Sequence, residues 1–107
     1  MSWDVSLIKE CKCCGHKDEI DVGNYTYNVS PMYKKAMGCS ISEFNGKLAK
    51  EVLDILSQGI YNMTNEPEVY KLMNPQNGYG DYEGALRFLQ KIHDVCKENQ
   101  DYIIEVS

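Results

Sequence analysis

One long apolar stripe constrains the fold of this chain more than any other feature. Between about Gly46 and Thr64, apolar residues recur at the three- and four-residue spacing of an amphipathic helix, and charged residues cover the remaining face. Such a helix has to bury its stripe against other elements. The 107 residues suffice for one core, so we expect a single domain, residues 1–107, built around this helix. The stripe comprises Leu48, Val52, Ile55, Gly59 and Met63, with Ala49, Leu53, Leu56 and Ile60 beside it.

Strand patterns flank this helix at both ends of the chain. The segment Trp3–Glu10 alternates loosely between apolar and polar residues, which predicts a strand. A turn at Cys11–His16 leads to a second predicted strand, roughly Glu19–Asn28, and a hairpin is the simple outcome. Tyr102–Val106 closes the chain as a third strand.

Three further helices are predicted from capping and breaking residues. Ser30-Pro31 opens a short helix that Gly38 ends, and Asn65 with Pro67 opens another that runs to Met73. The last helix runs from Tyr82 to about Glu98 and is capped by Asp81. The order β-β-α-α-α-α-β predicts an α+β fold, in which a small antiparallel or mixed sheet packs against about four helices. The sheet would consist of the N-terminal hairpin and the C-terminal strand.

Charge and hydropathy restrict the partners. The formal charge is −5, and the only adjacent basic pair is Lys34-Lys35, which argues against a nucleic-acid partner. No apolar run is long enough to span a bilayer, so no membrane partner is expected. Met1–Asp4 lacks the charged and apolar regions of a signal peptide, which predicts a cytoplasmic location.

Three short polar side chains share one face of the second predicted strand. Asn24, Thr26 and Asn28 would point to one side of it, and Tyr25, Tyr27 and Val29 to the other. A small domain gains stability from ordering such a row only if the row meets a partner. That partner is either the backbone of a neighbouring loop or a ligand.

The loop Asn74–Glu83 offers the complementary groups. It places two glycines and two tyrosines before a helix N-terminus, whose free N–H groups suit an anion, although Asp81 would occupy the same donors as a cap. Its rings could stack on a planar ligand. Alternatively, Tyr79 and Tyr82 pack on the core while the polar strand residues tie the loop down. The predicted ligand-binding residues are Asn24, Thr26, Asn28, Asn77, Tyr79, Tyr82 and Glu83.

Five cysteines, an odd count, argue against a disulfide framework. Cys11 and Cys14 form a C-x-x-C followed by Gly15, the spacing of a zinc knuckle. Tetrahedral zinc needs two more ligands, and the candidates are His93 with Cys96, or Cys39 with His16. The alternative is a tight hairpin turn with ordinary thiols.

Two motifs carry a resemblance. The pattern N-x-T-x-N at Asn24–Asn28, together with N-P-x-N-G-[WY]-G-x-Y-E at Asn74–Glu83, resembles a family of small phage and bacterial proteins with no assigned activity. The resemblance covers roughly Asp18–Val106 and implies a phage or mobile-element origin. Family members often have His where this chain has Tyr27, and Trp where it has Tyr79, which argues against a catalytic or metal-binding His at position 27.

These observations favour a binding protein over an enzyme, because His16 and His93 have no recognisable catalytic neighbours in the sequence. The first hypothesis is a non-enzymatic, phage-encoded protein that sequesters a small nucleotide-like ligand between the polar strand and the Asn77–Glu83 loop. The second is a module that binds and inhibits a host protein through an acidic surface, with zinc at Cys11 and Cys14. Exposed sheet edges in so short a chain also favour a homo-oligomer.

Overall fold

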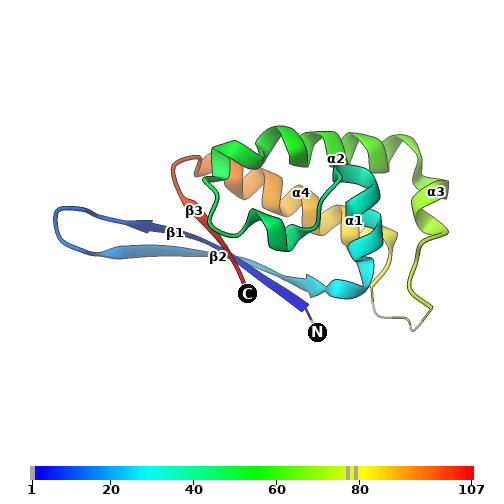
Figure 1. Ribbon diagram of the computed structural model, residues 1–107, viewed down its shortest axis with the longest axis horizontal. Coiled ribbons are helices and arrows are strands. Elements are labelled where there is room, and N and C mark those ends of the chain that lie inside the picture. Colours follow the sequence, from blue (N-terminus) through cyan, green and yellow to red (C-terminus); the bar gives the residue numbers. More distant parts are fainter. Residues whose placement is uncertain (1, 77, 79) are drawn as a thin grey trace.

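The computed structural model describes residues 2–76, 78 and 80–107 (Figure 1). Within them, one antiparallel sheet has the strand order β2-β1-β3, and the helices gather on one side of it (Figure 1). The α+β fold expected from the sequence is confirmed. The strands are β1 (Ser2–Glu10), β2 (Lys17–Thr26) and β3 (Ile103–Val106); the helices are α1 (Ser30–Met37), α2 (Leu53–Asn65), α3 (Pro67–Lys71) and α4 (Tyr82–Glu98); and short 3-10 turns occur at Tyr27–Val29, Ile41–Phe44 and Ala49–Val52.

A bulge in the sheet controls which side chains of β2 face the helices. Val5 pairs with Gly23 and Ser6 with Asp21, so Val22 is an extra residue on the β2 side. The alternation of β2 changes phase there. Val22 is fully buried, and Tyr25 pairs with the buried Trp3 on the same face. Asn24 consequently lies on the outer face, opposite Asp4.

The predicted end of the second strand is wrong by two residues. β2 stops at Thr26, and Tyr27–Val29 forms a 3-10 turn. The Thr26 side chain accepts a hydrogen bond from the Asn28 N–H (3.3 Å), which caps the turn and bends the chain out of the sheet. Asn24 and Thr26 therefore keep the strand alternation, whereas Asn28 leaves it.

The predicted start of the long helix at Gly46 is also wrong. The Gly46 N–H donates to the Ile104 carbonyl, and the Ile104 N–H donates to the Lys47 carbonyl, each at 2.8 Å. The chain at this point runs beside β3 and covers its free edge. Without this segment, the backbone N–H and C=O groups of that edge would be unpaired. Only after the Ala49–Val52 turn does the regular helix α2 begin.

The helix boundaries at Gly38 and Asp81 are confirmed, whereas the helix predicted to run from Asn65 to Met73 is shorter, Pro67–Lys71, and Asn65 still belongs to α2. Gly38 ends α1 with φ +80°, and Asp81 caps α4 by accepting a hydrogen bond from the Gly84 N–H (2.7 Å). The buried face of α4 consists of Tyr82, Ala85, Phe88, Leu89, Ile92 and Cys96, and Leu86 is half-buried. Among the described helices, none has the length and apolarity needed to cross a bilayer.

The β1–β2 hairpin extends well past the helices (Figure 1). Residues 9–19, which we call the hairpin arm, are all exposed. The arm gives the molecule its elongated shape, with principal extents of 50 × 26 × 17 Å. Because no residue of the arm is buried, the core does not depend on it.

Candidate functional site

Tyr25 ties the end of β2 to the start of α4. Its hydroxyl accepts a hydrogen bond from the Asp81 N–H (3.0 Å) and lies 3.4 Å from the Asp81 carbonyl, to which it can donate. Its ring packs beside Phe88, with centroids 5.7 Å apart. The hydroxyl lies against the backbone of Gly84, where an added Cβ would collide with it. The glycine in the first turn of α4 is therefore what allows this close approach.

Gly80 brings the preceding loop against the same strand. It has φ +92°, and an added Cβ would come within 2.5 Å of Thr26 Cγ2 and 3.1 Å of Val29 Cγ1. Both the left-handed backbone and the lack of space require glycine at this position. The polar strand end and the Gly/Tyr loop, which are some fifty positions apart in the sequence, thus lie side by side.

An open hollow lies where these segments meet. It has a volume of about 530 Å³ and extends from Tyr25 to Arg87. A second hollow of about 270 Å³ shares Tyr25, Gly84 and Arg87 with it and continues along the edge strand β2. We call the two together the β2–α4 groove. Its lining residues are Val22, Gly23, Asn24, Tyr25, Asn74, Pro75, Gly78, Gly80, Asp81, Gly84, Arg87, Phe88 and Lys91.

The groove contains two cations in an otherwise acidic protein. Arg87, the chain's one arginine, and Lys91 are both exposed and stand one turn apart on α4. In the described part of the chain neither has a carboxylate within 4.0 Å, and the Glu83–Arg87 pair that their i,i+4 spacing would allow is not formed. The carboxylate of Asp81 is engaged by the Gly84 N–H. The groove therefore offers positive charge to an anion.

The predicted ligand-binding residues have different positions relative to this groove. Asn24 is exposed and lines it. Thr26 is half-buried and holds the turn through Asn28, which is exposed outside the strand. Glu83 is exposed in the first turn of α4. Two further predictions, Asn77 and Tyr79, lie outside the described residues.

Tyr82 is a core residue. It is 7% exposed, and its hydroxyl donates to the Met63 carbonyl at 2.6 Å. Its N–H donates to Asn74 Oδ1 at 2.8 Å, which anchors the loop to the helix start. Tyr82 thus joins α4 to α2, and its ring is covered by the protein.

Tyr25, Arg87 and Lys91 line the groove but are not among the ligand-binding residues predicted from the sequence. The sequence does place Tyr25 on the face opposite the polar residues, and Gly23, an isolated glycine within the strand, is a signal for the bulge that aims Tyr25 at α4. A signal for the cations existed: Gly84, Arg87 and Lys91 follow the i, i+3, i+7 spacing of one helix face.

The hairpin turn holds three exposed thiols, Cys11, Cys13 and Cys14. The Cys11 N–H donates to the His16 carbonyl at 2.7 Å, and the Gly15 N–H donates to the Cys11 carbonyl at 2.8 Å. Hydrogen bonds from the backbone amides of Cys14 and Cys13, and then from the Cys14 thiol, lower the pKa of the Cys11 thiol.

Of the additional zinc ligands considered from the sequence, His16 belongs to this turn itself, whereas Cys39, His93 and Cys96 lie elsewhere in the fold. Cys96 is fully buried on the inner face of α4, and desolvation raises its pKa to about 11. Burial also raises the pKa of Cys39. The predicted four-ligand site within one chain is therefore wrong: among the residues that the structure describes, no three His, Cys, Asp or Glu side chains are grouped to hold a metal ion.

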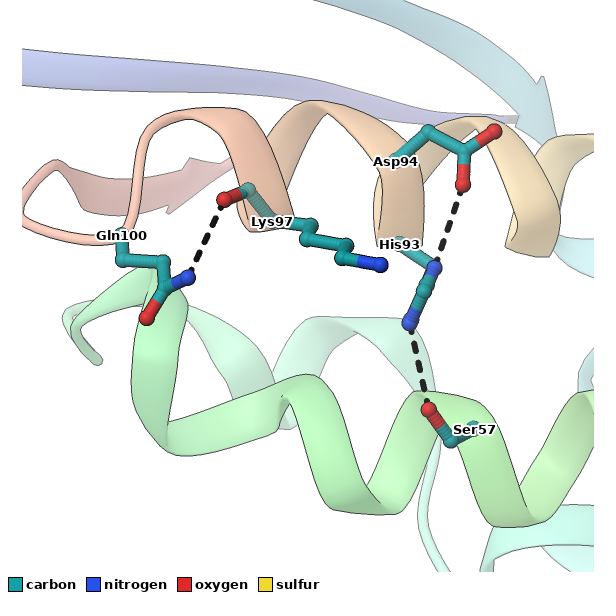
Figure 2. Close-up of polar contacts among 5 residues, drawn as sticks. All are labelled: Ser57, His93, Asp94, Lys97 and Gln100. Carbon is teal, nitrogen blue, oxygen red and sulfur yellow. Dashed lines mark hydrogen bonds and ion pairs between the residues drawn. The ribbon is translucent and has the colours of Figure 1, made fainter.

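His93 instead belongs to a chain of polar contacts between α2 and α4 (Figure 2). Its Nε2 lies 3.1 Å from Ser57 Oγ, and its Nδ1 lies 3.2 Å from Asp94 Oδ1. The order hydroxyl, imidazole, carboxylate is that of a catalytic triad. However, Ser57 lies within α2, where backbone N–H groups are bonded to carbonyls four residues earlier and cannot form an oxyanion hole. We therefore assign this contact to helix packing.

Comparisons of this chain with protein-family models, with curated proteins and with solved structures find no match. The assignment of function therefore depends on the geometry of the groove and of the hairpin arm.

Proposed function

We propose that the protein is a non-enzymatic binding protein that holds a small anionic, nucleotide-like ligand in the β2–α4 groove. The observation that supports this proposal most strongly is the position of Arg87. The chain's one arginine lines both parts of the groove, in a protein whose net charge is −5. An exposed cation that stands without a carboxylate partner on a hollow surface is suited to a phosphate.

The groups of the groove match the parts of a nucleotide. Arg87 can bind phosphate oxygens in a bidentate manner, and Lys91, one turn further along α4, can reach a second phosphate. Tyr25 provides a ring, already fixed by its hydrogen bonds to Asp81, against which a base can pack.

The resemblance of the two motifs to small phage proteins adds a biological role to this proposal. A phage-encoded binder without catalytic groups acts by occupancy, so the ligand would be a host signalling nucleotide that the protein sequesters. Such a role requires tight binding and slow release, and no chemical change to the ligand.

Isothermal titration with ADP-ribose and with cyclic dinucleotides tests this function. We expect saturable heat with at least one of these ligands, and a loss of about tenfold or more in affinity for Arg87→Ala. Lys50→Ala is the matched control, because Lys50 is exposed, carries the same charge and lies outside the groove. The absence of heat at millimolar ligand, or equal losses in both variants, would contradict the proposal.

The outer face of the sheet supports a second candidate function, binding of a basic host protein. The register places Asp4, Glu19, Asp21 and Glu105 on the face away from the helices, and all four are exposed. An acidic sheet of this kind accelerates association with a positively charged partner. A pull-down from host lysate at rising salt, compared with an Asp21→Lys/Glu105→Lys variant, tests it: a basic protein lost in the variant supports this function, and identical captures exclude it.

A further inference from the structure

We propose that Cys11 and Cys14 form one half of a zinc site, and that the same pair from a second copy of this chain completes it. The Gly15 N–H donates to the Cys11 carbonyl, so Cys11–Gly15 forms one i→i+4 turn at the tip of the hairpin arm, and both cysteines in it are exposed. Residues three apart in one such turn have Cβ atoms about 5–6 Å apart, which lets both sulfurs reach one ion.

The turn that carries the two cysteines is fixed by its own hydrogen bonds. The Cys11–His16 and Gly15–Cys11 backbone hydrogen bonds close the turn, and Gly15 adopts φ +71°. Because this backbone is already ordered, an ion that binds between the two thiols does not have to order it first.

The number of ligands requires a second chain. Structural zinc sites are almost always four-coordinate, and a single arm offers the C-x-x-C pair. Among the residues that the structure describes, no third His, Cys, Asp or Glu side chain is grouped with this pair. Two arms together supply four thiols, each of which releases its proton to solvent when zinc binds.

The shape and charge of the arm allow two tips to meet. The arm projects beyond the helices along the 50 Å axis, so the bodies of two copies stay apart (Figure 1). Three lysines and three carboxylates between residues 9 and 19 balance, so the tips do not repel each other as two whole chains of charge −5 would. Lys12, which lies within the motif, partly offsets the excess negative charge of four thiolates on one divalent ion.

Native mass spectrometry of the full chain with added Zn²⁺ and a phosphine reductant tests this proposal. We expect a dimer with one zinc ion per two chains that dissociates when EDTA is added. Replacing Zn²⁺ by Co²⁺ should give the intense visible bands of tetrahedral thiolate coordination. The reductant excludes disulfide-linked dimers, so a metal-dependent dimer reports on coordination.

Cys14→Ser and Cys13→Ser form a matched pair of variants. Both remove an exposed thiol from the same turn. We expect Cys14→Ser to lose both the zinc and the dimer, and Cys13→Ser to keep both. A zinc-free monomer of the unmodified chain, a monomer with one zinc ion, or equal losses in the two variants would overturn the proposal. Circular dichroism of each variant verifies that the body remains folded.

Discussion

At the scale of single residues, Gly80 and Gly84 determine how closely the segments of the groove approach each other. An alanine at Gly84 would normally stabilise α4 by about 1 kcal/mol, because glycine is a poor helix former. Here its Cβ would collide with the Tyr25 hydroxyl, so we predict that Gly84→Ala destabilises the protein by about 1–3 kcal/mol. A double-mutant cycle in urea measures the effect. In a Tyr25→Ala background the same substitution should cost little or become stabilising, whereas a stabilising effect in the unmodified chain would contradict the contact.

At the scale of elements, the hairpin arm should contribute little to the free energy of unfolding. Because residues 9–19 are all exposed, replacing residues 10–17 by an Asn-Gly turn should change the free energy of unfolding by no more than about 0.5 kcal/mol. The replacement keeps Lys9 and Asp18 as the paired ends of the strands. Chemical denaturation measures this, and the shortened chain should also stay monomeric in zinc. A large loss of stability would show that the arm supports the fold.

The elements also show what the sequence could predict. The hairpin, the α4 cap at Asp81 and the end of α1 at Gly38 follow from neighbouring residues, and these predictions agree with the structure. The departure of Gly46 and Lys47 from the predicted helix depends on their hydrogen bonds to Ile104, more than fifty residues away, which no local pattern carries. The same limit applies to the groove, since Tyr25 and Arg87 meet only through the tertiary fold.

At the scale of the whole molecule, the free energy of unfolding should fall at alkaline pH because the thiol of Cys96 is buried. Burial raises the pKa of Cys96 to about 11 from the ordinary value of 9.0. Between these values the unfolded chain loses the proton while the folded chain keeps it, so the free energy of unfolding falls as pH rises past 9. Burial also raises the pKa of Tyr33, Tyr70 and Tyr82, which extends the fall above pH 10.

The variant Cys96→Val separates the effect of the buried thiol on stability from the effect of the buried tyrosines. Denaturation midpoints from pH 7 to 10, with chelator present, should decline less steeply between pH 9 and 10 for this variant than for the unmodified chain. Parallel declines would show that Cys96 does not carry the effect.

If the β2–α4 groove binds a small anion, the bound ligand has to lie beside the groove residues, and its position on the protein can be measured. Nitrogen–proton spectra of the full chain, recorded while ADP-ribose or a cyclic dinucleotide is added, locate the bound ligand. We predict that the largest changes occur at the Gly80 and Gly84 amides and at the Arg87 side chain. Spectra that stay unchanged at millimolar ligand, or changes gathered around Ser57 and His93 instead, would contradict binding in this groove.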